Sequence, residues 1–306
     1  MPTPIVEIEN LTKDYETGFW RKRKTRALDG LSLTVESGQI FGFLGANGAG
    51  KTTTLKLLMR LIFPTAGTAR ILDRDIGDVA MHARIGYLPE NPYFYDYLTA
   101  REFLNYCGQL FGLDRDTRER RTQELLTRVN LETKGWDRQL RKFSKGMLQR
   151  VGLAQALVND PEIVFLDEPM SGLDPVGRRE VRDLIASLRT QGKTVFMCSH
   201  ILSDIEVLCD SVAILKHGRL AHAGSLAELR ANEANTVEVI AIGADAEVLK
   251  RLLGQGATVA TTAGGVRIEV ADETQVDEVI AALRSVNGKL VSVQPVRQSL
   301  EELFLD

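Results

Sequence analysis

A glycine-rich segment near residue 45 restricts the folds open to this chain more than any other feature of its sequence. Residues 45–52 read Gly-Ala-Asn-Gly-Ala-Gly-Lys-Thr and match the pattern G-x-x-x-x-G-K-[S/T] in full. The segment follows the apolar run 39–44, typical of a buried strand, and opens a helix-period segment over 51–62. Strand, glycine-rich loop and helix are the context in which this pattern cradles phosphate. The sequence therefore predicts a phosphate-binding loop in an α/β fold.

The parts of this loop have distinct chemical roles. Glycines let backbone N–H groups curl around phosphate oxygens, and the helix N-terminus adds partial positive charge. Lys51 is expected to reach the β and γ phosphates, and the Thr52 hydroxyl is expected to bind Mg²⁺. The residues expected to bind the nucleotide are Asn47, Gly48, Ala49, Gly50, Lys51, Thr52 and Thr53.

A second apolar run, 163–166, ends in two acids, Asp167 and Glu168. A strand that ends in Asp beside a phosphate loop can hold Mg²⁺ from the other side, which is the Walker B arrangement. Asp167 is therefore expected to join Thr52 as a metal ligand. Glu168 is expected to polarise water for in-line attack on the γ-phosphate. The alternative is a strand that ends in solvated acids, and the phosphate loop upstream argues against it.

With these motifs in place, the sequence resembles the ATP-binding cassette (ABC) ATPases. Residues 143–147, Phe-Ser-Lys-Gly-Met, stand where that family has its LSGGQ signature. Two positions fit the family letters and two depart from them. The resemblance implies that the signature faces the γ-phosphate of ATP on a second subunit, through Ser144, Lys145, Gly146 and Met147. The alternative for Ser144 is an ordinary helix N-cap.

Three further residues fit the same family. Asp174 resembles the D-loop residue that links the two ATP sites, and Asp174 followed by Pro175 is also a good helix start. His200, just after the apolar run 194–198, matches the switch histidine that contacts the γ-phosphate. Tyr15 matches the aromatic residue that stacks on adenine, although it could be an ordinary strand aromatic.

One position departs from the family in a way that affects the metal. After residues 85–89, Ile-Gly-Tyr-Leu-Pro, the family usually places Gln, whose amide touches Mg²⁺ and the attacking water, whereas this chain has Glu90. A carboxylate there adds attraction to the metal and repulsion from the γ-phosphate and from Glu168. Glu90 is therefore expected as a further metal contact, with its coordination left open.

The chain divides into two regions by pattern. Over 4–232, strands alternate with helices as in an α/β domain. The resemblance implies a P-loop NTPase ABC cassette there, with a RecA-like core, an antiparallel β subdomain and a helical insertion at about 91–158. Over 235–306 the order is strand, helix, strand, strand, helix, strand, which predicts a small ferredoxin-like α+β accessory domain. Gly264 and Gly265 are expected to form its hairpin turn, and the capping box 299–302 predicts a terminal helix.

The second region shows strand alternation without catalytic motifs. Its expected buried positions are Val237, Val239, Val266, Ile268, Val270, Val291 and Val293. It has no phosphate loop, no metal-type His or Cys cluster and no Tyr or Trp for base stacking. We expect it to steady the cassette dimer or its docking to a membrane partner, with a regulatory role as the main competitor.

Two surface segments carry weaker signals. The basic run 19–26 is either a solvated hairpin tip or a contact for an anionic lipid or partner. The tyrosine-rich run 92–97 follows Glu90, where the family receives a short helix from its membrane subunit, and tyrosines suit interfaces. Its alternative is a core patch under the helical insertion.

Composition and hydropathy indicate where the protein is expected to act and with which partners. No apolar stretch approaches the roughly 20 residues of a membrane helix, and the N-terminus lacks the basic start and apolar region of a signal peptide. The net charge of −3 calls for no nucleic-acid partner. With the resemblance, we expect an ATP-hydrolysing, Mg²⁺-dependent subunit of an exporter-like ABC transporter. It would form a homodimer at the cytoplasmic face of the cell membrane, held there by a separate membrane-spanning permease. An importer ATPase is the alternative; a soluble non-transport ABC ATPase fits less well.

Overall fold

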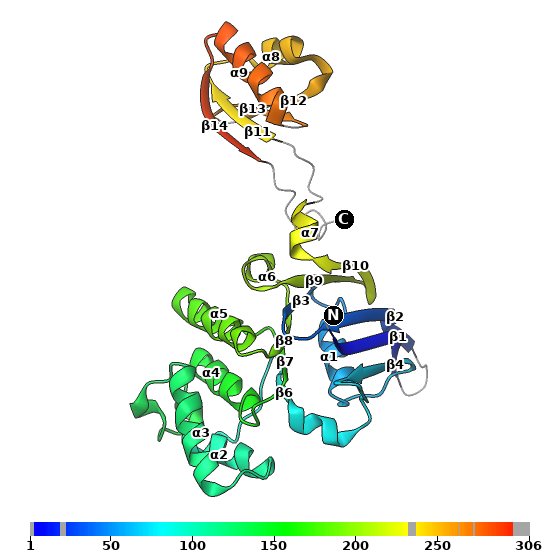
Figure 1. Cartoon of the computed structure of the whole chain (residues 1–306), viewed down its shortest axis with the longest axis vertical. Coiled ribbons are helices and arrows are strands. Elements are labelled where there is room, and N and C mark those ends of the chain that lie inside the picture. Colours follow the sequence, from blue (N-terminus) through cyan, green and yellow to red (C-terminus); the bar gives the residue numbers. More distant parts are fainter. Residues whose placement is uncertain (1–2, 19–22, 232–236, 263, 272, 296–306) are drawn as a thin grey trace. The chain divides into compact units, whose positions relative to one another are not determined.

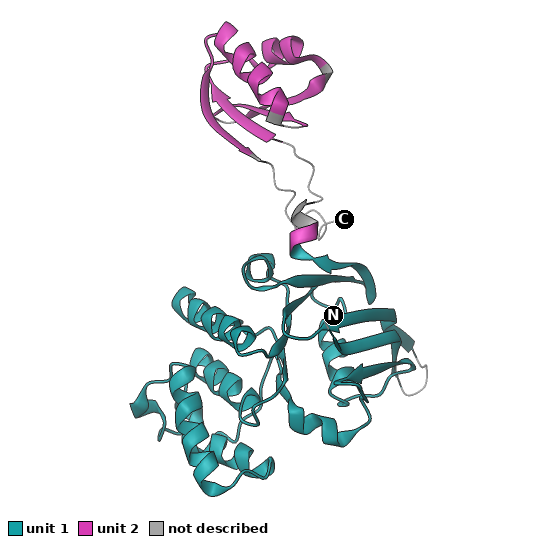
Figure 2. Cartoon of the chain, in the orientation of Figure 1, with its two compact units in different colours: residues 1–226 teal, residues 227–306 magenta. Residues whose placement is uncertain are grey.

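The chain forms two compact units (Figures 1 and 2). Each unit has its own hydrophobic core. The structure, a computed structural model, describes residues 3–18, 23–231, 237–262, 264–271 and 273–295. Unit 1 covers 1–226 and unit 2 covers 227–306. The boundary expected from the sequence, at 232–235, lies outside the described residues, as do residues 19–22 of the basic run 19–26.

Among the described residues, unit 1 contains a six-stranded sheet in the order β10-β9-β3-β8-β7-β6. Its strands are β3 (Ile40–Leu44), β6 (Ile85–Leu88), β7 (Ile163–Asp167), β8 (Thr194–Ser199), β9 (Ser211–Lys216) and β10 (Arg219–Ser225). All pairs are parallel except β9 with β10. Every residue of β3, β7 and β8 is buried, as expected for parallel strands covered on both faces.

A second sheet in the described part of unit 1 has the order β2-β1-β4-β5 and is antiparallel. Its strands are β1 (Pro4–Thr17), β2 (Arg23–Glu36), β4 (Ala66–Ile71) and β5 (Arg74–Asp75). One hydrophobic core joins it to the parallel sheet, where the rings of Phe43 and Phe165 lie 5.4 Å from that of Phe196. This core fixes the strand ends on which the site depends.

Outside the helical insertion, the described helices of unit 1 are α1 (Lys51–Leu58), the 3-10 turn η1 (Val79–Arg84), α5 (Pro175–Thr190) and α6 (Leu202–Leu208), and α7 (Leu226–Ala231) begins at the boundary between the units. The expected start of α1 near Lys51 agrees with the structure. The expectation that α1 would continue to Ile62 is wrong, because Arg60 takes a left-handed backbone (φ 55°) and ends the helix.

The helical insertion contains α2 (Ala100–Leu110), α3 (Arg115–Arg128) and α4 (Lys145–Ala156), with 3-10 turns η2 (Thr133–Gly135) and η3 (Leu140–Lys142) between the last two. The capping box at its start is confirmed: the Glu102 N–H donates to Thr99 Oγ1 and the Thr99 N–H donates to Glu102 Oε2. Trp136 packs within this insertion, where its Nε1–H donates to the Leu131 carbonyl at 2.9 Å and the Arg101 guanidinium lies over its ring.

The described residues of unit 2 form a sheet in the order β12-β13-β11-β14, with all pairs antiparallel. The elements are β11 (Val237–Ile242), α8 (Ala246–Leu253), η4 (Gly254–Gly256), β12 (Ala257–Thr262), β13 (Gly265–Val270), η5 (Glu273–Gln275), α9 (Val276–Ser285) and β14 (Lys289–Pro295). The predicted β-α-β-β-α-β order is confirmed. Leu249 of α8 and Val279 and Leu283 of α9 pack on the apolar side of the sheet.

Two expectations for unit 2 are wrong in detail. Gly265 pairs with Thr262 inside the strand ladder, so it belongs to β13 and not to the turn. Val291 and Val293 are 57% and 42% exposed because β14 is an edge strand whose register shifts opposite β11. The expected terminal helix at 299–302 lies outside the described residues. No helix in the described ranges is long and apolar enough to cross a membrane.

Candidate active site

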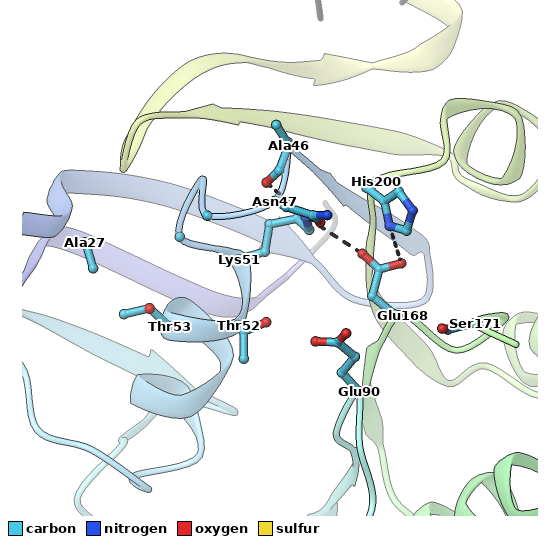
Figure 3. A pocket seen from close by; sticks show the side chains of 12 residues that line it. Ala27, Ala46, Asn47, Lys51, Thr52, Thr53, Glu90, Glu168, Ser171 and His200 are labelled. Carbon is cyan, nitrogen blue, oxygen red and sulfur yellow. Dashed lines mark hydrogen bonds and ion pairs between the residues drawn. The ribbon is translucent and has the colours of Figure 1, made fainter. Parts of the chain in front are cut away.

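The carboxyl ends of three adjacent parallel strands meet at one edge of the large sheet. β3 leads into the loop 45–52, β7 ends at Asp167, and β8 is followed by His200. A cavity of about 340 Å³ lies at this edge (Figure 3), the usual place for a ligand in an open α/β sheet. It is lined by Ala27, Ala46, Asn47, Gly48, Gly50, Lys51, Thr52, Thr53, Glu90, Glu168, Ser171 and His200.

The tight course of the loop requires glycine at particular points. Gly50 precedes α1 with φ 113°, a backbone that side chains rarely adopt. A Cβ there would lie 2.7 Å from the Ala27 carbonyl oxygen, and one on Gly45 would lie 2.7 Å from the Leu215 carbonyl oxygen. The loop can therefore approach the neighbouring strands only without these side chains, which leaves its backbone free to curl round a ligand.

Lys51 lies at the centre of the loop and is only 6% exposed. Its ammonium donates to the carbonyl of Gly45 at 2.6 Å and to that of Ala46 at 3.3 Å. It also lies 3.8 Å from Glu168 Oε1. A buried cation held by two neutral carbonyls and one carboxylate is ready to exchange these partners for phosphate oxygens.

Glu168 reaches into the cavity because its backbone is left-handed, with φ 50°. Such a residue costs about 1–3 kcal/mol and persists only where its surroundings hold it. Here its N–H donates to the Cys198 carbonyl at 3.0 Å. Its Oε2 lies 2.9 Å from Nδ1 of the half-exposed His200 (Figure 3). The two residues expected beside the γ-phosphate are thus brought into direct contact.

Asp167 is fully buried, and neither carboxylate oxygen has a hydrogen-bond partner among the described residues. Burial raises the pKa of this carboxyl to about 6; the nearby Thr52 side chain lowers it, and the charges of Glu168 and Glu90 raise it. Thr52 nonetheless makes no hydrogen bond of ordinary geometry with either oxygen. An orphaned carboxylate beside a hydroxyl and a second carboxylate is an oxygen donor set of the kind that Mg²⁺ takes.

We expect Asp167→Asn to raise the melting temperature of the nucleotide-free, metal-free protein near pH 7.5. Burial raises the pKa of this carboxyl from its ordinary value of 3.8 to about 6, so its ionisation costs stability that grows between these two pH values and is fully present above about pH 6. Removing that charge should gain on the order of 1–3 kcal/mol in the free energy of unfolding. The gain should shrink as the pH falls below about 6, because wild-type Asp167 is then protonated.

Thermal unfolding in EDTA at two pH values measures this effect. The exposed Asp137, whose pKa is lowered by its hydrogen bonds with Arg101, provides the control. Asp137→Asn should not raise the melting temperature, because it removes a paired charge. A lower melting temperature for Asp167→Asn at both pH values would contradict an unpaired buried carboxylate at this position.

Tyr15 is not among the residues that line the described cavity. It lies on β1 opposite Thr25 of β2, and its ring centre is 5.3 Å from Lys13 Nζ. Ala27, two positions along β2 from that partner, reaches the cavity instead. Ala27 was not predicted as a site residue, because a small, neutral side chain carries no sequence signal for nucleotide binding.

The signature and the D-loop residue also lie outside the lining of this cavity. Ser144 is the exposed N-cap of α4, and its Oγ accepts from the Met147 N–H at 3.3 Å. Asp174 is the N-cap of α5 and accepts from the Gly177 N–H at 3.0 Å. Both therefore make the N-caps proposed for them, and both are exposed at the surface of the chain.

The Lys145 side chain, in the signature, packs over Gly172, where a Cβ would lie 2.6 Å from Lys145 Cδ. Gly146 is close to Leu173, so the signature and the D-loop are neighbours within the chain. Glu90, which follows β6, is exposed and lines the cavity, as its predicted metal contact requires.

Sequence reasoning missed a buried amide that supports the site. Gln149 of α4 is buried, and its Nε2 donates to the Pro169 carbonyl at 2.9 Å. It thereby holds the backbone just after Glu168 against the signature helix. A glutamine at an otherwise core-facing helical position was the available signal.

Comparisons with known proteins agree on one family. Residues 28–171 match the family described as ABC transporter, and residues 224–306 match the one described as ATP-binding protein DrrA1-3-like, C-terminal domain. An uncharacterized ABC transporter ATP-binding protein of Synechocystis is 47% identical over 98% of this chain and 84% of its own length. The Nod factor export ATP-binding protein I of Ralstonia nicotianae is 37% identical over 82% of this chain and 76% of its own.

A solved structure gives the same answer. The dimer of an ATP-binding cassette in a post-hydrolysis state, bound to ADP and Pi, is 26% identical to this chain. It superposes with a TM-score of 0.67 over 72% of this chain and 98% of that one. With the phosphate loop, the acid-tipped strand and His200 gathered in one cavity, this chain belongs to the ABC transporter family as one of its ATP-hydrolysing, ATP-binding proteins.

Proposed function

We propose that this ABC ATPase powers export through a separate membrane-spanning permease, and that two copies of the chain act together. The observation that carries the proposal is the cavity in which Glu168 contacts both Lys51 and His200 while Ser144 stays outside its lining. One chain thus holds the groups for hydrolysis but lacks its signature contact. A second copy is the natural source of that contact.

The chain's own residues suffice for in-line attack on a phosphoanhydride. The loop's N–H groups and Lys51 bind the β and γ phosphates, and Glu168 accepts the proton of the attacking water. His200 orients the Glu168 carboxylate through the 2.9 Å contact and faces the γ-phosphate. Thr52 and Asp167, with Glu90, would hold Mg²⁺, which when bound neutralises charge on the phosphates. No covalent intermediate is required.

The second copy would supply Ser144, Lys145, Gly146 and Met147 to the γ-phosphate, with Asp174 at the contact between the two sites. The dimeric arrangement of the solved cassette supports a pair, and a single chain with one of each motif supports a homodimer. In the same proposal Tyr15 stacks on adenine once nucleotide is bound, next to the wall that carries Ala27.

Two features support an export-type partner at the cytoplasmic face of the cell membrane. A curated relative is named for Nod factor export, and the second unit matches the DrrA1-3-like C-terminal family. The tyrosines of the segment after Glu90 lie at the surface, with Tyr93 86% and Tyr97 60% exposed, whereas Phe94 packs on Phe103 of the helical insertion. Exposed tyrosines close in sequence to Glu90 of the cavity form a surface suited to a permease. An importer ATPase would use the same cavity with a different partner.

The test is to co-purify the chain with its membrane partner and measure hydrolysis. The complex should hydrolyse ATP only with Mg²⁺, and a transported compound should stimulate that hydrolysis from the cytoplasmic side of reconstituted vesicles. Stimulation only from the opposite side would replace export by import. Absence of any membrane protein from the purified complex would argue for a non-transport role.

A chain that ends at Asn232 should bind ATP with nearly unchanged affinity, yet dimerise or couple to transport less well. Every residue of the cavity lies in unit 1, and unit 2 has a separate core. Equilibrium binding of a fluorescent ATP analogue, together with light scattering of the ATP-bound form, measures both effects. If the truncated chain loses ATP binding while it remains folded, unit 2 must belong to the nucleotide site.

A further inference from the structure

A network of ion pairs and backbone hydrogen bonds joins the Ala27 wall of the cavity to the phosphate loop. We propose that Arg219, through Asp29, is a positioning residue that sets the affinity for ATP by holding this wall against the loop. The proposal rests on the cavity being the ATP site. It concerns residues that the sequence analysis did not connect with nucleotide binding.

The backbone part of the network passes through Gly218, in the turn between β9 and β10. The Gly218 N–H donates to the Ala49 carbonyl of the phosphate loop at 2.9 Å, and the Asp29 N–H donates to the Gly218 carbonyl at 2.9 Å. Gly218 has φ 79°, and a Cβ there would lie 2.7 Å from the Ala27 carbonyl oxygen. The turn is therefore packed between the wall and the loop and determines their separation.

The side-chain part of the network holds this turn in place. Arg219, the next residue after the turn, donates from Nε to Asp29 Oδ2 at 2.7 Å. Arg26 donates from Nη1 to the other Asp29 oxygen at 2.8 Å and from Nε to Asp14 Oδ1 at 2.9 Å. The hydrogen bonds from Arg219 and then Arg26 hold the pKa of Asp29 below its usual range. Asp29 therefore stays charged, and both of its oxygens are engaged.

The ends of this network lie at the base side of the expected nucleotide. Arg26 immediately precedes Ala27, and Asp14 immediately precedes Tyr15, the proposed adenine contact. The groups for hydrolysis, Glu168 and His200, follow β7 and β8, which β3 separates from β9 and β10 in the sheet. Loosening the network should thus weaken nucleotide binding and leave the chemical step alone. Because Arg219 is 74% exposed, the effect of its loss should be moderate.

The experiment compares Arg219→Ala with the wild-type chain at saturating Mg²⁺. We expect the dissociation constant for a fluorescent ATP analogue, and KM for ATP, to rise about two- to fivefold with kcat unchanged. Arg219→Lys should restore most of the affinity, since a cation then still reaches Asp29. Adding Arg219→Ala to Asp29→Asn should have little further effect, because the two residues act in one network.

The control is Arg115→Ala, which removes another exposed arginine from its ion pair with Glu119 on α3. It should leave both the dissociation constant and KM unchanged. The proposal is overturned if Arg219→Ala lowers kcat at constant KM, or if Arg115→Ala has the same effect. Lys51→Ala tests the assignment of the cavity independently of Arg219. If that variant bound ATP normally, the cavity would not be the ATP site.

Discussion

Replacement of Glu168 by Gln should leave ATP binding intact and lower the turnover number by about 100-fold or more. Gln has nearly the same shape, so the left-handed backbone at 168 and the neighbouring strands are undisturbed. Its amide cannot accept the proton of the attacking water, which removes general base catalysis worth about 10²–10⁴-fold. Steady-state hydrolysis and equilibrium binding of ATP measure the two properties separately.

Glu162→Gln is the matched control for this prediction. Glu162 precedes the amino end of the same strand, β7, and pairs with Arg84 on the surface. It should retain normal turnover. The Glu168 variant should also accumulate an ATP-bound dimer, because hydrolysis no longer separates the subunits. Near-normal hydrolysis by Glu168→Gln would remove this residue from the role of base.

Ser144→Arg should abolish hydrolysis while the chain still binds ATP through its own Lys51. The new side chain places bulk and charge at the exposed N-terminus of α4, where the facing γ-phosphate is proposed to dock. The cavity of the same chain is unaffected, because Ser144 is not among its lining residues. Hydrolysis and nucleotide binding by the purified variant give the first comparison.

Mixing this variant with a Lys51→Ala chain tests where the signature acts. If it acts in trans, one site of the mixed dimer combines intact Lys51 from the first chain with intact Ser144 from the second, and activity returns. A partner that carries both substitutions is the control and should restore nothing. If mixed dimers form and remain inactive, trans assembly is wrong.

Much of the candidate site could be predicted because its reactive side chains follow the ends of strands. Lys51, Asp167 and His200 each follow an apolar run that is long enough to be a buried parallel strand, and such strands share one edge of the sheet. The contacts of Glu168 with Lys51 and with His200 could not be predicted from the sequence. They depend on a left-handed backbone that no local sequence pattern predicts.

The supporting residues could not be predicted for a different reason. Ala27 lines the cavity and Arg219 pairs with Asp29, but these contacts join the two sheets across long sequence separations. Neither residue type carries a chemical signature. Arg26 looked like one more charge in a basic run, and only its two carboxylate partners show its position in a network.

The fold of unit 2 could likewise be predicted only in part. Alternating apolar residues predicted its strands, because a half-buried strand has a period of two. The exposure of Val291 and Val293 depends on β14 being at the edge of the sheet, which is decided by strand order and not by the strand's own sequence. The end of α1 likewise depends on the backbone of one residue, Arg60.

The position of Trp136 allows the helical insertion to be followed separately by tryptophan fluorescence. The chain has two tryptophans, at 20 and 136, and no tyrosine or tryptophan after residue 235. In a Trp20→Phe chain the remaining indole is bonded to the Leu131 carbonyl and covered by Arg101. Its emission maximum and its quenching would then report on the insertion that carries the signature helix. Residues after 235 would contribute no tryptophan emission.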